Sequence, residues 1–142
     1  MPALSNSLQQ ALDQALTKAS EASLEYATLE HLLLALTQDE SAREVMSSCS
    51  VDVDALTRDL DLYIDGLQPS SVLQPRRSPE PNPSPAFVRV VQRAILFTES
   101  IGRYEVSGAI ALLSIFSERE SRAAMLLAEH NVTRIDVVRF VH

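Results

Sequence analysis

The sequence predicts an all-α fold of eight helices, arranged as two pseudo-symmetric four-helix repeats. Only 3 of the 142 residues are Gly and 5% are aromatic, while Ala and Leu are abundant, a composition that favours helices over strands. Apolar residues recur with the period of an amphipathic helix, and the same pattern returns in the second half of the chain. The length fits one compact domain with a single core.

The predicted helix at 5–20 matches the one at 85–100. Both carry small or apolar residues at the i, i+3, i+4, i+7 spacing of a buried stripe. Ser5 and Ser84 stand where an N-cap hydroxyl belongs, and Pro85 falls at the first helical position, where its missing N–H costs nothing. We call the match of position 5 with position 84 the repeat alignment. It pairs Leu8, Ala11, Leu12, Ala15 and Leu16 with Phe87, Val90, Val91, Ala94 and Ile95.

The repeat alignment also relates a second pair of predicted helices, 28–38 and 107–117. Each opens with a hydroxyl residue, Thr28 or Ser107, suited to an N-cap. The segment 32–36 (LLLAL) is apolar on nearly every side and too short to span a membrane, which predicts a central buried helix.

Four further helices complete the repeats. They are predicted at 41–48, 52–65, 120–130 and 133–141. The offset between matched positions grows slightly along these segments, where Ser41 pairs with Ser121 and Val51 with Val132. Such growth is expected when loops between helices gain single residues.

The expected organisation is one domain over 1–142, with repeat one at 1–66, a linker at 67–84 and repeat two at 85–142. The linker is rich in Pro and Ser and has no apolar period, so we predict an extended tether. A Pro-rich ligand for a recognition domain is the alternative reading of this tract.

Charge and hydropathy narrow the partner classes. Residues 1–66 carry a formal charge of −9 and residues 67–142 a charge of +2, without a cluster of cations that would bind a phosphate backbone. Nucleic acid is therefore not an expected partner. No stretch is long and apolar enough for a membrane span and no secretion signal is evident, so we expect a cytoplasmic protein. Cys49 is expected to be a buried small hydrophobe.

The sequence lacks the motifs of common enzymes. A phosphate-binding loop is missing, and no G-x-S-x-G elbow surrounds a serine. The three histidines, His31, His130 and His142, are scattered and are expected to be surface or partly packed side chains, not zinc ligands. We therefore expect no catalytic residue, no metal and no cofactor in this chain.

Two segments resemble a known family, the N-terminal domains of Clp-type AAA+ unfoldases. The first is 26–36 (YATLEHLLLAL), and the second runs through 107–109 (SGA) to 114–118 (SIFSE). Further likeness lies in 87–94 (FVRVVQRA) and 132–138 (VTRIDVV). These motifs resemble ClpA more than ClpB or ClpC, and such proteins continue into two ATPase modules that use ATP and Mg²⁺.

The resemblance implies a docking function. In a ClpA-like unfoldase the domain binds the adaptor ClpS, which brings N-degron substrates for unfolding by the hexamer and degradation by ClpP. It also implies five adaptor-facing residues, which we carry over as Glu25, Glu30, Ser84, Arg89 and Arg134. A carboxylate at Glu30, in the first turn of its helix, is expected to remain available to a partner cation. The Ser84 hydroxyl is expected both to cap its helix and to contact a partner.

An alternative function is direct capture of unfolded protein segments in an apolar groove between the repeats. The isolated domain is expected to be a monomer in either case.

Overall fold

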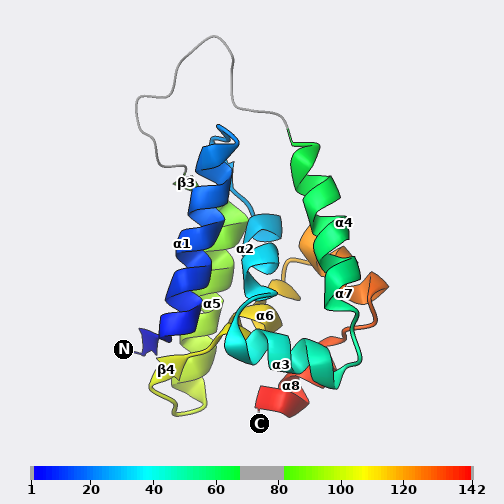
Figure 1. Cartoon of the computed structure of the whole chain (residues 1–142). Helices are drawn as coiled ribbons and strands as arrows, with labels where there is room; N and C mark the ends of the chain where they lie inside the picture. The colour runs from blue at the N-terminus through cyan, green and yellow to red at the C-terminus, as the bar shows by residue number, and fades with distance from the viewer. Residues whose placement is uncertain (1, 68–81, 142) are drawn as a thin grey trace.

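The computed structural model describes residues 2–67 and 82–141, and in these ranges eight helices and four two-residue strands are formed (Figure 1). The prediction of an all-α fold is confirmed. The helices are α1 (Asn6–Glu21), α2 (Leu29–Leu36), α3 (Glu40–Ser48), α4 (Val53–Asp65), α5 (Pro85–Ser100), α6 (Gly108–Ile115), α7 (Arg122–Glu129) and α8 (Arg134–Val141). The strands are β1 (Ala3–Leu4), β2 (Tyr26–Ala27), β3 (Asn82–Pro83) and β4 (Glu105–Val106).

The helices that the repeat alignment relates each begin after an N-cap residue with a hydroxyl group. The Oγ of Ser5 accepts a hydrogen bond from the N–H of Leu8 at 3.0 Å, and Ser84 caps α5 in the same way through Phe87 at 3.2 Å. Thr28 and Ser107 are the N-caps of α2 and α6. Each cap therefore satisfies a backbone donor that the first helical turn leaves free.

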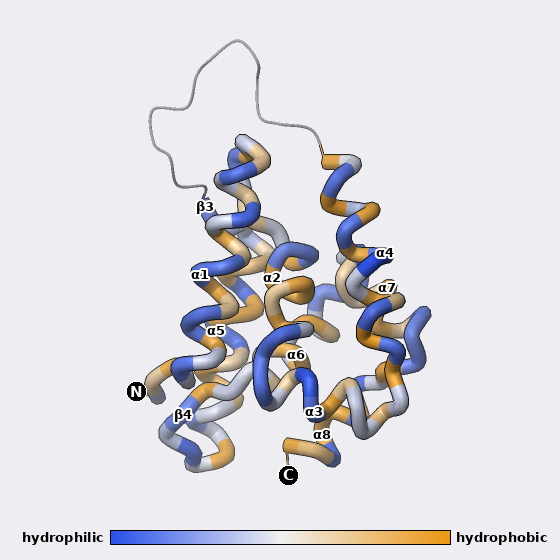
Figure 2. The backbone as a smooth tube through the Cα atoms, in the orientation of Figure 1, coloured by the Kyte–Doolittle hydropathy of each residue, from blue (hydrophilic) through white to orange (hydrophobic). Residues whose placement is uncertain are grey.

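The core is one cluster shared by both repeats, and α2 and α6 lie at its centre. Every residue of α6 is buried, as is every residue of α2 except the half-buried Leu34. Figure 2 shows hydrophobic residues along these two helices in the middle of the molecule. The prediction that the LLLAL segment forms a central buried helix is confirmed.

Two short parallel strand pairs join the repeats, and the sequence analysis missed them. β1 pairs with β4, and β2 pairs with β3, so each pair contains one strand from each repeat. The two pairs are equivalent under the repeat alignment. The bond from Ser5 N to Val106 O (2.9 Å) corresponds to that from Ser84 N to Ala27 O (2.8 Å). A pseudo-twofold relation therefore links the halves.

The last residues of the predicted linker belong to this pairing. Residues 68–81 of the predicted linker lie outside the described residues, whereas Asn82 and Pro83 form β3. Pro83 is tolerated because the bonds to β2 are donated by the N–H groups of Asn82 and Ser84 on either side of it. The predicted linker therefore ends before residue 82.

Two loops of each repeat reverse direction through a residue with positive φ. Ser23 (φ 58°) corresponds to Gly102 (φ 73°), and Ser50 (φ 59°) to Asn131 (φ 65°). After each of them the next N–H bonds back to a carbonyl five residues earlier, as in the bond from Leu24 N to Ala19 O at 3.0 Å. This is the Schellman ending of a helix, and its presence in both repeats explains why these helices end at corresponding positions.

A buried carboxylate ties the starts of three helices together. Asp39, 2% exposed, caps α3 through the N–H of Ala42 and accepts a hydrogen bond from the Ser7 hydroxyl of α1 at 2.8 Å. Ser41 in turn accepts from Ala109 N of α6 at 2.9 Å. A Cβ at Gly108 would overlap the Asp39 carboxylate, which accounts for glycine where repeat one has Leu29.

Three single-residue expectations need correction or fall outside the structure. Cys49 is only half-buried because it is the C-cap of α3, and partial burial raises the pKa of its thiol. His31 is not a surface residue: it is 1% exposed, since its ring folds back to cap α2. His142 lies outside the described residues. In the described ranges no helix is long and apolar enough to cross a membrane.

Candidate partner-binding surface

The β2–β3 pair brings two of the predicted contact residues together. The carbonyl oxygen of Glu25 accepts a hydrogen bond from Asn82 N at 3.1 Å, and Ser84 N donates to Ala27 O. Glu25 is exposed and therefore available to a partner. The Ser84 hydroxyl is half-buried and accepts from Phe87 N, so it is engaged in capping α5.

Arg89 lies on the exposed side of α5, about one and a half turns after Ser84. Its guanidinium donates two hydrogen bonds to the Glu118 carboxylate, from Nη2 to Oε1 at 2.7 Å and from Nε to Oε2 at 3.1 Å. These bonds lower the pKa of the Glu118 carboxyl and raise the pKa of Arg89. The Arg89 side chain remains 50% exposed while paired, so it can still face a partner.

The expectation that Glu30 is available to a partner cation is wrong. Glu30 is 6% exposed, and its Oε2 accepts a hydrogen bond from Ala123 N at 2.9 Å. That N–H belongs to the first turn of α7, which starts after the N-cap Ser121. The carboxylate therefore serves the N-terminus of a helix in the other repeat, where negative charge is favoured.

Arg134 lies apart from the other predicted residues. It is exposed and begins α8, as predicted. In Figure 1, however, α8 is at the bottom of the molecule, whereas β3 is at the top. The five residues therefore do not form one continuous face.

The surface that remains combines both repeats around the β2–β3 pair. We define the β2–β3 surface as Glu25, Tyr26, Ser84, Arg89 and Glu118. Tyr26 is 43% exposed and adds an aromatic side chain to this set. Sequence analysis missed Tyr26 and Glu118. The tyrosine that directly follows Glu25 was a usable signal, whereas the Arg89–Glu118 pair spans 29 residues and left none.

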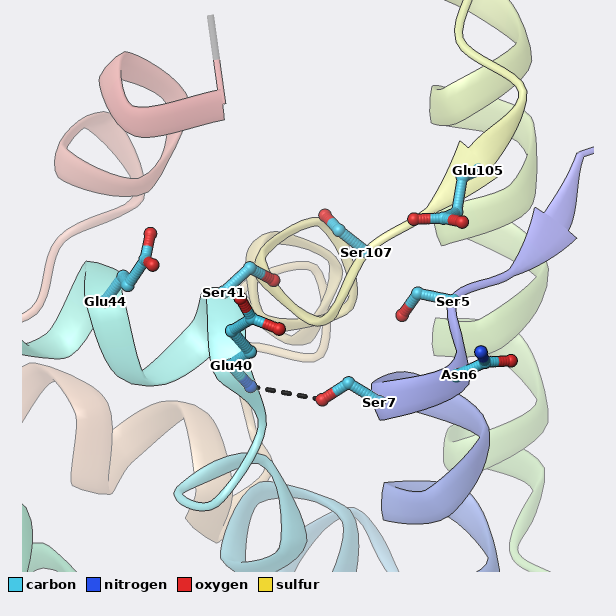
Figure 3. Close-up of a pocket in the computed structure, with 8 residues that line it drawn as sticks. All are labelled: Ser5, Asn6, Ser7, Glu40, Ser41, Glu44, Glu105 and Ser107. Carbon is cyan, nitrogen blue, oxygen red and sulfur yellow. Dashed lines mark hydrogen bonds between the residues drawn. The ribbon is translucent and has the colours of Figure 1, made fainter.

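The pseudo-twofold relation places a different surface around β1 and β4. Figure 3 shows the residues that line an open hollow there. Its volume is about 400 Å³. Although three helices begin nearby, their caps are already satisfied: Ser5 and Ser107 accept from their own helices, and Ser7 accepts from Glu40 N at 3.1 Å. The hollow is lined by Ser5, Asn6, Ser7, Glu40, Ser41, Glu44, Glu105 and Ser107.

The surface chemistry is suited to protein binding more than to metal binding. Within residues 2–67 and 82–141, no three His, Cys, Asp or Glu side chains gather so that they could hold a metal ion. His130 is instead paired with Asp59 of α4, at 2.7 Å between Nε2 and Oδ2. In the β2–β3 surface, Tyr26 and Arg89 are of residue types enriched in protein interfaces, and the charged side chains suit a polar rim.

Comparison with known proteins identifies relatives of this chain. Residues 3–130 match the family model described as the Clp repeat (R) N-terminal domain. A ClpA homolog protein from Fuscovulum blasticum is 45% identical over 141 residues, which are 99% of this chain and 18% of that protein. The chain thus spans about a fifth of that relative's length.

Solved structures share the fold. The N-terminal domain of Hsp104 from Candida albicans superimposes with a TM-score of 0.81 at 11% identity, covering 97% of this chain and 88% of that one. A complex of the ClpV N-domain with a VipB peptide gives a TM-score of 0.70 at 21% identity, covering 94% and 81%. At these identities the likeness concerns the fold alone.

Proposed function

Because this chain belongs to the Clp repeat N-terminal domain family, we propose that it is the docking domain of a ClpA-like AAA+ unfoldase and binds a ClpS-type adaptor through the β2–β3 surface. The adaptor would bring N-degron proteins, which the unfoldase passes to ClpP for degradation. The domain itself carries out no reaction in this proposal. ATP and Mg²⁺ would be used by other modules of the parent hexamer, in the cytoplasm.

The observation that carries this proposal is the strand pairing that brings Glu25 next to the start of α5, the helix of Ser84 and Arg89. The hydrogen bond from Asn82 N holds the backbone of Glu25 against β3, and Ser84 leads directly into the helix that carries Arg89. The surface offers a free carboxylate and a half-exposed guanidinium, a mixed polar set that fixes the orientation of a partner and steers its approach. Glu30 would act indirectly, by holding α7 through its buried hydrogen bond.

Arg134 has a separate place in the proposal. Its distance from β3 means that an adaptor seated on the β2–β3 surface would reach it only with a second, remote contact. We therefore expect charge reversal at Glu25 to weaken adaptor binding more than charge reversal at Arg134.

Calorimetric titration of a ClpS-type adaptor into the 142-residue chain tests the proposal. Glu25→Lys should weaken binding about tenfold, since it turns an attractive charge into a repulsive one. Glu105→Lys is the matched control, because it makes the same change at an exposed glutamate of β4, in the symmetry-related strand pair. An affinity that Glu25→Lys leaves unchanged, with both variants equally helical, would contradict the site.

Direct binding of protein segments is the second candidate function. It is favoured by the ClpV N-domain, which shares the fold and has been solved in complex with a VipB peptide. Titrating an unstructured peptide without adaptor into the same variants separates the two functions. Peptide binding that persists in Glu25→Lys, together with no adaptor binding by the original chain, would favour this second function.

A further inference from the structure

The outer side of α5 carries a stripe of exposed residues that lies outside the hydrophobic core. Val88, Arg89, Gln92, Arg93 and Leu96 follow the helical spacing of one face, and all five are exposed. Leu96 leaves 64% of its surface accessible and Val88 leaves 38%. Two apolar side chains and two arginines therefore share one face of a sixteen-residue helix.

The equivalent helix α1 shows that packing does not require this stripe. Each buried residue of α5 has a buried counterpart in α1 under the repeat alignment, from Phe87 and Leu8 to Thr98 and Ala19. On the outer side, however, the α1 stripe is polar and has no basic residue. It consists of Gln9, Gln10, Asp13, Gln14 and Thr17, which are likewise exposed.

The charge around the α5 stripe is positive although the whole chain carries −7. Glu118 neutralises Arg89 and also lies within electrostatic reach of Arg93, which lowers the pKa of its carboxyl further. Exposed Arg119 follows Glu118 in the chain and is itself followed by exposed Glu120, so these two residues add no net charge. Within the stripe, two guanidinium groups therefore act on one carboxylate, which leaves one net positive charge on this face of α5.

We propose that the α5 stripe docks an acidic amphipathic helix of a partner protein. Apolar side chains of that helix would cover Val88 and Leu96, while its carboxylates would face Arg93 and the exposed part of Arg89. This proposal rests on the docking function proposed above and adds to it the chemistry of a partner segment. The excess positive charge on an otherwise acidic chain selects an acidic segment over a basic one.

A synthetic acidic helix is a direct probe of the stripe. We would use a capped peptide of about 15 residues, with leucine at i, i+4 and i+8 and glutamate at the flanking positions, and a counterpart with lysine for each glutamate. In a titration followed by ¹⁵N–¹H correlation spectra of the 142-residue chain, the acidic peptide should shift the amides of α5 but not those of α1. Its affinity should fall as salt is raised, and the lysine counterpart should not bind.

The test variant copies residues of α1, the equivalent helix of the other repeat, into α5. Val88→Gln, Arg93→Gln and Leu96→Thr together give α5 the residues that α1 has at 9, 14 and 17, and leave Glu25 and the Arg89–Glu118 pair intact. This triple variant should bind the acidic peptide about tenfold more weakly and retain its helicity by circular dichroism. Replacing Gln9 and Gln14 by alanine is the control and should leave the affinity unchanged.

The outcomes separate this inference from the adaptor proposal. Three results would each overturn the proposed docking site on the α5 stripe. They are equal binding of the acidic and basic peptides, no binding of the acidic peptide, and a triple variant that binds as well as the original chain. Binding of the chain to phosphatidylserine vesicles that is lost in the triple variant, without peptide binding, would also overturn it in favour of a membrane surface. In all of these cases, adaptor binding that Glu25→Lys weakens would still support the proposed docking function.

Discussion

His31 is held in one protonation state by the start of its own helix. Its Nδ1 accepts a hydrogen bond from Thr28 N at 3.1 Å, which requires that ring nitrogen to be unprotonated. The proton of the neutral ring is therefore on Nε2, a buried atom without a hydrogen-bond partner among the described residues. A second proton would remove the acceptor and abolish half of the capping box.

This geometry makes the stability of the chain dependent on His31 at acidic pH. Burial, followed by the charge of Lys18, lowers the pKa of His31 from 6.5 to about 4. Because the unfolded chain binds the proton more readily, the free energy of unfolding should fall as pH decreases from 6.5 to about 4 and then level off. The expected loss from this group is about 3 kcal/mol, measured by urea denaturation at pH 7 and pH 4.

His31→Gln isolates that contribution. A glutamine at this position can still accept from Thr28 N, but it does not titrate. The variant should therefore lose about 3 kcal/mol less than the original chain between the two pH values. Equal losses in both proteins would show that other groups cause the acid sensitivity.

At the scale of the elements, α7 depends on a carboxylate from the opposite repeat. Glu30→Ala would leave the buried N–H of Ala123 without its acceptor, at a cost of about 2 kcal/mol in the free energy of unfolding. Glu30→Gln can keep an acceptor and should cost less. Denaturation gives the total, and hydrogen exchange should show α7 amides losing protection before those of α5.

Glu120 provides the control for this prediction. It lies two residues before α7 begins and is exposed, so Glu120→Ala removes a carboxylate from the same region without uncovering a buried donor. Its stability should change by less than about 0.5 kcal/mol. If Glu30→Ala is no more destabilising than Glu120→Ala, the bond to Ala123 contributes little.

The elements also show which interactions a single sequence can predict. Apolar period and hydroxyl caps are local signals, and they predicted eight helices with starts such as Thr28 and Ser107. The strand pairs were missed because each has two residues and its partner is in the other repeat. Glu30 was correctly placed in the first turn of α2, but its carboxylate serves α7, 93 residues away. Such long-range pairings leave no periodic signal.

At the scale of the whole molecule, the repeats are interlocked and not merely adjacent. Each strand pair takes one strand from each half, and α2 contacts α5, α6 and α7 across the boundary. Side chains add the Glu30–Ala123, Ser41–Ala109 and Asp59–His130 links. A docking surface that uses Glu25 from one half and Arg89 from the other therefore depends on both halves being folded together.

Neither half should fold alone. A chain of about 60 residues buries too little surface for robust stability, and here separation would also expose the central faces of α2 and α6 and unpair all four strands. Residues 1–67 and 82–142, produced separately, should show little helix by circular dichroism and should regain most of the helical signal when mixed in equal amounts. The intact 142-residue chain is the reference for the reassembled complex. A cooperative unfolding transition in either half by itself would show that the duplicated motif is an independent folding unit, and that the interlocked strands join two domains already formed.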